Sequence, residues 1–114
     1  MWGTGSPKRE FLHVDDLAAA VVHLGNSYNS SDHINIGTGE DLTIKELAEM
    51  VAELAGFSGE IAWDSSKPDG TPRKVLDVSK AKSLGWAPKI SLRDGIASTI
   101  AWYKDASAKG VARR

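Results

Sequence analysis

The chain has 114 residues, of which 41% are hydrophobic and 25% charged, a composition ordinary for one globular domain with a modest core. Its formal net charge of −1 provides no global positive field for nucleic acid or an anionic membrane, so any anion site must be local. The absence of cysteine excludes a disulfide framework, a thiolate zinc site and a cysteine nucleophile, and it is consistent with a cytoplasmic protein.

The N-terminal stretch "MWGTGSPKREF" lacks the basic-then-apolar order of a signal peptide. No run of about 18 apolar residues is present that would span a membrane. A loop rich in glycine and proline follows Met1 at once, with no element before it to anchor it. We therefore expect a soluble domain over residues 1–114 that is a piece of a longer chain, whose preceding strand is missing.

The first predicted elements are a short strand at "REFLHV" and a helix that begins at Asp15 or Asp16 and runs through "LAAAVVHLG". Acidic residues suit the positive N-terminal end of a helix, and Gly25 is expected to end it. The polar stretch "NSYNSSD" then indicates a loop, and "HINIG" a second short strand.

The clearest helix is predicted at "LTIKELAEMVAELAG". Thr43 and Glu46 form the pattern of a capping box, and Gly56 supplies the stop. Its apolar side chains recur on one helical face, at Ile44, Leu47, Ala48, Val51, Leu54 and Ala55.

The last third of the chain predicts strands at "EIAWD" and "KVLD", one or two helical turns at "DVSKAKSLG", and a helix at "ISLRDGIASTIAWYKD". Ser91 and Asp94 repeat the capping pattern at the start of that helix. The expected fold class is therefore α/β, a small sheet of short strands with about three helices.

The octamer "KPDGTPRK", residues 67–74, predicts a shaped loop. Two prolines each fix φ and remove an amide donor, and Gly70 permits positive φ, so the segment cannot lie inside a helix or a central strand. Three cations with only Asp69 to offset them suit a bound anion such as a phosphate. A plain solvated connection is the alternative on these residues alone.

A second stretch, "HINIGTGEDLTIKELAEM", imitates the strand, glycine turn and helix of a dinucleotide-binding unit. The third glycine of that motif is replaced by Leu42, and the chain is too short for the several further parallel strands of a complete cofactor domain. A plain turn between a strand and a helix is therefore favoured.

Three stretches, "WGTGSPKREFLHVDDLAAA", "HINIGTGEDLTIKELAEMVAELAG" and "DSSKPDGTPRKVLDVSKAKSLGW", together resemble the C-terminal part of the GDP-L-fucose synthase family of extended short-chain dehydrogenases/reductases. The resemblance implies an intact enzyme, an oxidoreductase and epimerase, that converts GDP-4-keto-6-deoxy-D-mannose to GDP-L-fucose with NADP(H). It also implies a homodimer and a missing N-terminal Rossmann domain that carries the cofactor loop and the catalytic Ser, Tyr-x-x-x-Lys, Cys and His residues. In this chain Tyr28 is followed four residues later by Asp32, and Tyr103 by Ser107, so that tyrosine-lysine motif is absent.

Carried onto this sequence, the resemblance implies substrate contacts by Trp2, Arg9, Asp69 and Lys74, and no catalytic residue or bound cofactor in this lobe alone. Arg9 offers a planar fork for phosphate oxygens, Lys74 a compact charge, and Trp2 an apolar face. Asp69 could accept from a sugar hydroxyl or a guanine donor. Whether Lys8 also contacts phosphate stays open.

Three other readings of the chain stay open. It could be a non-catalytic nucleotide-sugar binding module or a small interaction domain, or it could come from another NAD(P)-dependent nucleotide-sugar epimerase or dehydratase, because "RxFxHVDDxA" and "NxGxG" are shared across that superfamily.

A metal site at His13, Asp15 and Asp16 is not favoured, because alternation turns His13 away from its neighbours and Asp16 suits a helix cap.

Overall fold

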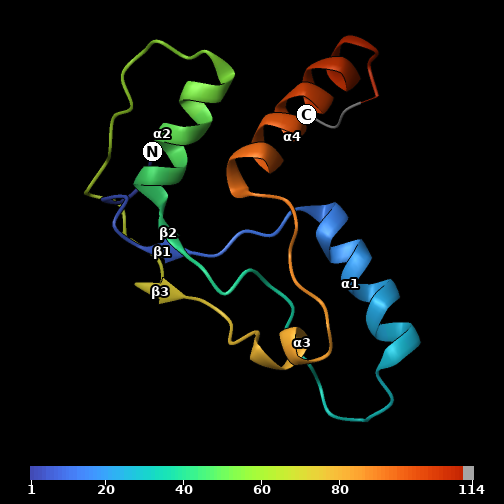
Figure 1. Ribbon diagram of the computed structural model, residues 1–114. Coiled ribbons are helices and arrows are strands. Elements are labelled where there is room, and N and C mark those ends of the chain that lie inside the picture. The colour runs from blue at the N-terminus through green and yellow to red at the C-terminus, as the bar shows by residue number, and fades with distance from the viewer. Residues whose placement is uncertain (112–114) are drawn as a thin grey trace.

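The computed structural model describes residues 1–111, in which four helices surround a very small sheet (Figure 1). The helices are α1 (Val14–Ser27), α2 (Ile44–Ala55), α3 (Ser79–Ser83) and α4 (Leu92–Ala108). Three helices were expected. The fourth is α3, which forms at "DVSKAKSLG", where one or two helical turns were predicted. None of the described helices is both long and apolar enough to cross a membrane.

The sheet has three strands of two residues each, in the order β2-β1-β3. The central strand β1 (Lys8–Arg9) runs antiparallel to β2 (Leu42–Thr43) and parallel to β3 (Arg73–Lys74). The paired residues are Lys8 with Thr43 and Arg73, and Arg9 with Leu42 and Lys74. Residues that are 33 to 65 positions apart in the sequence therefore meet on the two edges of one dipeptide.

Helix α2 begins and ends where its sequence predicts. The Thr43 hydroxyl accepts from the Glu46 N–H at 3.0 Å, and the Glu46 carboxylate accepts from the Thr43 N–H at 3.0 Å, which completes the capping box. Gly56 ends the helix with φ of 73°, in the left-handed region that glycine adopts without strain. Helix α4 likewise has Ser91 as its N-cap.

Helix α1 differs from the expectation at both ends. Its N-cap is His13, whose Nδ1 accepts from the Asp15 N–H at 3.0 Å, so neither Asp15 nor Asp16 caps it. The helix also continues two residues past Gly25, to Ser27. A helical Gly25 costs backbone entropy only, and one glycine does not stop a helix whose next residues still make hydrogen bonds.

The strand predictions were largely wrong. Residues 33–37 and 60–64 form no strand, apart from one isolated bridge between Asp64 and Trp2, and the strands predicted at 9–14 and 74–77 are shortened to Lys8–Arg9 and Arg73–Lys74. Alternation did place Ile34 and Ile36 on the core, where they pack beside Trp86. A strand also needs a neighbour for its N–H and C=O groups. Within the described chain residues 33–37 have none, and residues 60–64 have only residues 1–3 along one edge.

The core is small and the molecule is open. Ala20, Ala81 and Trp86 are its fully enclosed cluster, at 5% exposure or less. The radius of gyration is 16.8 Å, whereas a compact domain of this length has about 13 Å. Helices α2 and α4 pack on each other, while α1 stands apart from both (Figure 1). Much apolar surface consequently stays uncovered by the described residues.

A buried carboxylate joins α1 to the segment that leads into α4. Asp16 is 4% exposed, and its two oxygens accept from the Lys89 N–H at 3.1 and 3.2 Å and from the Ile90 N–H at 3.0 Å. These amides follow Pro88 and lie outside any helix, so the carboxylate is the partner that satisfies them.

Replacing Asp16 should therefore destabilise the fold more than replacing its neighbour. We expect Asp16→Ala to lower the free energy of unfolding by about 2–3 kcal/mol, because two amides lose a charged acceptor. Asp15→Ala is the matched control: that side chain is exposed, so its loss should cost less than about 1 kcal/mol. Urea unfolding followed by tryptophan fluorescence measures both, and equal losses would contradict the role given to Asp16.

Candidate functional site

Two loops that are far apart in the sequence come together beside the sheet. The N-terminal loop, residues 1–7, is tied to the start of α2, where Gly5 C=O accepts from the Lys45 N–H at 3.0 Å and Pro7 C=O from the Ile44 N–H at 2.9 Å. On its other side the Gly3 N–H donates to Asp64 C=O at 2.9 Å. The first two amide groups of α2 therefore donate to carbonyl groups of the N-terminal loop.

Asp69 links the 67–74 loop to the N-terminal loop. Its Oδ1 accepts from the Thr4 N–H at 2.8 Å and its Oδ2 from the Thr4 hydroxyl at 2.7 Å. The backbone donor and then the hydroxyl hold the pKa of Asp69 below its ordinary value of 3.8. Gly3 allows this approach, because it has φ of +81° and a Cβ there would lie 2.2 Å from Oδ1.

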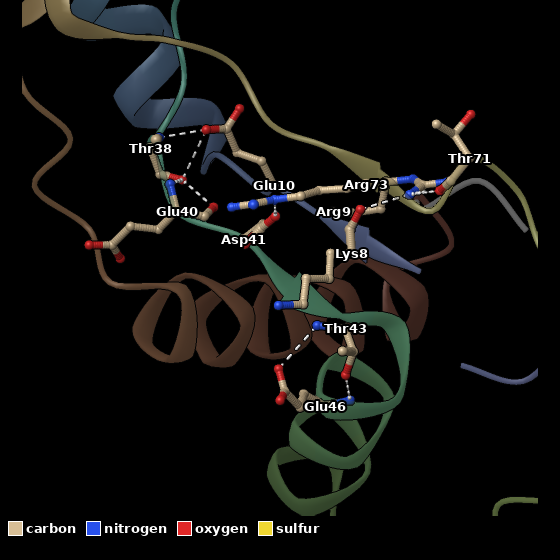
Figure 2. A network of polar contacts seen from close by, with 11 residues as sticks. Lys8, Arg9, Glu10, Thr38, Glu40, Asp41, Thr43, Glu46, Thr71 and Arg73 are labelled. Atoms are coloured by element: carbon tan, nitrogen blue, oxygen red, sulfur yellow. Dashed lines mark hydrogen bonds and ion pairs between the residues drawn. The ribbon is translucent and has the colours of Figure 1, made fainter. Parts of the chain in front are cut away.

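Arg9 projects from β1 against the 67–74 loop without a carboxylate partner among the described residues (Figure 2). Its Nη1 donates to Lys8 C=O at 2.7 Å and to Thr71 C=O at 2.5 Å. A Cβ on Gly70 would lie 2.9 Å from Nη2, so the bare glycine makes room for the guanidinium. The fork is thus held by neutral carbonyls, and its positive charge is left for a ligand.

The neighbouring Arg73 behaves differently. Figure 2 shows it reaching in the opposite direction from Arg9, where its Nε donates to the Asp41 carboxylate at 2.7 Å. That ion pair spans the central strand, since Asp41 precedes β2 and Arg73 lies on β3. Of the two arginines, only Arg9 keeps an unneutralised charge.

Lys74 lies next to Arg9 on the adjacent strand, because the parallel register pairs these two residues. Trp2 is 73% exposed at the edge of the N-terminal loop, and Lys67 Nζ lies 5.4 Å from its ring centroid, a cation–π distance. The site therefore has an exposed aromatic face with cations on and around it.

These side chains border a small recess of about 120 Å³. It is lined by Trp2, Gly5, Pro7, Arg9, Ile44, Pro68, Asp69 and Gly70. Three of the four expected site residues are thus brought together, and Lys74 stands just outside beside Arg9. Small-molecule sites usually measure about 300–1,000 Å³, so this recess is smaller than a typical complete ligand site.

A larger hollow, of about 560 Å³, lies between residues 38–42 and 87–92. Its charged lining is mixed, with Glu40 and Asp41 facing Lys82 and Lys89. It offers no excess of positive charge for a phosphate. The lining of the smaller recess is also balanced, by Arg9 and Asp69, but Lys67 and Lys74 lie beside that recess and give it the excess of positive charge.

The glycine turn that imitates a dinucleotide-binding loop holds a carboxylate of the protein. The Gly39 N–H donates to Glu10 Oε2 at 2.5 Å, and the Thr38 hydroxyl lies 3.4 Å from the same oxygen (Figure 2). This agrees with the plain turn favoured from the missing third glycine.

The structure also brings a serine, a histidine and an aspartate together. Ser98 Oγ lies 3.3 Å from His13 Nε2, and Asp15 Oδ2 lies 3.9 Å from His13 Nδ1. Nδ1, however, accepts from the Asp15 N–H, so the ring proton is on Nε2 and the ring cannot take a proton from the serine. These three residues connect the start of α1 to α4.

One tyrosine and one lysine do meet, although no Tyr-x-x-x-Lys motif exists. Lys80 Nζ lies 5.2 Å from the Tyr28 ring centroid, and its hydrogen bond lowers the pKa of Tyr28. The pair lies where α3 approaches the loop after α1, away from β1 and the recess (Figure 1). This contact connects the loop after α1 to α3 and lies outside the candidate site.

Sequence reasoning did not single out Thr4 or Gly70 as site residues. Thr4 is 65 residues from Asp69, and no local pattern connects them. Gly70, between two prolines, did indicate a shaped loop, but only the structure shows that its missing side chain accommodates Arg9.

The chain is similar to several proteins of known name. A family model described as the NAD dependent epimerase/dehydratase family matches residues 1–37. GDP-L-fucose synthase 1 of Arabidopsis thaliana is 61% identical over 103 residues, which cover 90% of this chain and 32% of that protein. The expected resemblance to GDP-L-fucose synthase is thereby confirmed, and the chain spans about a third of the curated relatives it matches.

Solved structures agree on the fold. A GDP-6-OMe-4-keto-L-xylo-heptose reductase from C. jejuni superimposes with a TM-score of 0.85 at 45% identity, covering 92% of this chain and 33% of the other. A GDP-L-fucose synthetase from Naegleria fowleri bound to NADP gives 0.90 at 23% identity, covering 98% and 36%, which supports the fold alone. The expected α/β class is confirmed, and the chain matches about a third of each of these two solved structures.

The link between Asp69 and Thr4 predicts a pH dependence. A carboxyl whose pKa is lowered on folding stabilises the loop contact above its unfolded pKa of 3.8 and loses that contribution as the pH falls through the folded pKa. In an NMR titration, the Thr4 amide shift should therefore change with a midpoint below 3.8. Thr4→Val removes one donor and should raise the midpoint, and Asp69→Asn should abolish the titration. A midpoint at or above the ordinary value would contradict the contact.

Proposed function

We propose that this chain is the C-terminal, GDP-sugar-binding lobe of an NADP(H)-dependent epimerase/reductase that converts GDP-4-keto-6-deoxy-D-mannose to GDP-L-fucose. The observation that carries the proposal is the unneutralised Arg9 guanidinium at the recess, beside Lys74 and an exposed Trp2. The 61% identity to a GDP-L-fucose synthase and the 45% identity to a GDP-sugar reductase support the same ligand class.

Each group suits one part of the ligand. A diphosphate carries oxygens that Arg9 can bind through two donors and that Lys74 can attract as a point charge. The exposed face of Trp2 suits a flat, apolar surface such as a base or a sugar ring. Asp69 is engaged by Thr4, yet each carboxylate oxygen can accept a further hydrogen bond from a hydroxyl or a guanine donor.

The remainder of the site belongs to a second lobe. The recess is smaller than a nucleotide sugar, and α1 exposes Val14, Leu17, Val21 and Val22 at 43–68%. Uncovered apolar side chains in this number mark a surface that another part of the protein covers. We assign that lobe the NADP(H) site and the catalytic acid, base and tyrosine groups, in a homodimeric enzyme.

The isolated chain should be catalytically inactive. With NADPH and GDP-4-keto-6-deoxymannose, the 114-residue protein should show no NADPH oxidation above a buffer control, whereas the full-length enzyme should turn over. The reason is that the sequence has neither a complete glycine-rich cofactor loop nor a Tyr-x-x-x-Lys motif. If the isolated chain oxidises NADPH, as followed by the absorbance of NADPH, the division into two lobes is refuted.

Two substitutions test the nucleotide contacts in the full-length enzyme. Arg9→Ala and Lys74→Ala should each weaken GDP binding by about tenfold to a hundredfold, the cost of a lost charge-assisted contact, and should leave NADPH affinity unchanged. Arg9→Lys should recover part of the loss, because the ammonium keeps the charge without the fork. Lys104→Ala, an exposed residue of α4, is the control.

Calorimetry with GDP and with UDP measures these contacts apart from chemistry at the sugar. Preference for UDP would favour another nucleotide-sugar epimerase, and GDP binding without any activity of the full-length protein would favour a non-catalytic module. If both alanine variants bind GDP as tightly as the parent, with the fold intact, the diphosphate site is not here.

A further inference from the structure

Glu10 is the residue at which the chain leaves the sheet, directly after Arg9. Its carboxylate accepts from the Gly39 N–H at 2.5 Å, with the Thr38 hydroxyl at 3.4 Å (Figure 2). Within residues 1–111 it forms no ion pair. The strongest contact that the structure gives this half-buried charge is therefore a backbone amide of a distant turn.

The turn is shaped to receive that carboxylate. A Cβ on Gly37 would lie 2.6 Å from Glu10 Oε1 and 2.9 Å from its carboxyl carbon, so the acid rests against bare backbone. Gly39 has φ of +73°, which turns its N–H inward in a conformation that other residues adopt only with strain. Glu10 thus accounts for Gly37, whereas Gly39 is explained by its positive φ and by Val78, whose Cγ2 would lie 2.9 Å from a Cβ there.

The contact extends the pairing of β1 and β2 by one step. Lys8 and Arg9 pair with Thr43 and Leu42 through the backbone, and Glu10 then reaches Gly39, just upstream of β2, through its side chain. Two-residue strands have few hydrogen bonds to specify their register. A third link at the end of β1 would oppose sliding or fraying of the strand at Arg9.

We infer that Glu10 is a positioning residue for the ligand site: held by the Gly37–Gly39 turn, it fixes the end of β1 and so places the Arg9 guanidinium at the recess. The inference rests on the proposed function, because it acts through the contact of Arg9 with the diphosphate. Glu10 itself does not line the recess. Its role requires a hydrogen-bond acceptor of the right length, and the negative charge is incidental.

Three substitutions in the full-length enzyme separate these features. Glu10→Ala removes the acceptor and should weaken GDP binding roughly fivefold to tenfold. Glu10→Gln keeps an oxygen at the same reach and should stay within about twofold of the parent. Glu10→Asp is one carbon shorter and should fall between them. If Glu10→Ala does not fold, the comparison of Gln with Asp still decides the question.

A double-mutant cycle with Arg9 provides the readout that a general loss of stability would not move. If Glu10 acts only through Arg9, Glu10→Ala should have no further effect on GDP affinity in an Arg9→Ala background. Ser91→Ala, which removes the N-cap of α4, is the control for stability: it should lower the melting temperature and leave GDP affinity unchanged.

The outcomes distinguish this inference from the proposed function. If Arg9→Ala weakens GDP binding but Glu10→Ala does not, the positioning role is wrong and the site stands. If the two effects are additive, or if Glu10→Gln is as weak as Glu10→Ala, Glu10 acts on the ligand by charge and the inference is overturned. If Arg9→Ala has no effect on GDP binding, the proposed site itself fails.

Discussion

The pairing of the dipeptide Lys8–Arg9 on both of its edges is the constraint on which the rest of this structure depends. One edge carries β2 and thereby the start of α2, and the other carries β3 and the end of the 67–74 loop. Because the backbone of β1 is satisfied on both sides, Arg9 emerges at one defined place between the loops. Without that pairing, the two loops that border the recess would lose their attachment to each other through β1.

Small polar contacts reinforce this sheet, since its hydrophobic support is slight. The Arg73–Asp41 ion pair crosses the central strand, and Asp69 joins the two loops through Thr4. The buried core lies elsewhere and is formed by Ala20 of α1, Ala81 of α3 and Trp86. The site is therefore held by directional hydrogen bonds, and apolar side chains of α1 stay exposed in the part of the chain that the structure describes.

Some of the site was accessible from the sequence and some was not. "KPDGTPRK" indicated a shaped cationic loop through its prolines and Gly70, and the resemblance to GDP-L-fucose synthase pointed to Arg9 and Lys74. Nothing local could reveal that Thr4 holds Asp69, that Arg73 is neutralised by Asp41, or that the glycine turn holds Glu10. These pairs are separated by 29 to 65 residues, and each forms only when the chain brings its partners together.

The sequence by itself determined where α2 and α4 begin, because their signals are local: the capping box at Thr43 and Glu46, the N-cap at Ser91 and the apolar periodicity all act within a few turns. For α1 it indicated a helix but not its ends. It did not determine the strands. Alternation placed Ile34 and Ile36 on the core, but a strand exists only where another segment accepts and donates its hydrogen bonds. Tertiary structure alone decided that Lys8 and Arg9 have such partners on both edges, whereas within the described residues 33–37 have none and 60–64 have only residues 1–3 on one edge. With that it decided where the charge of Arg9 lies.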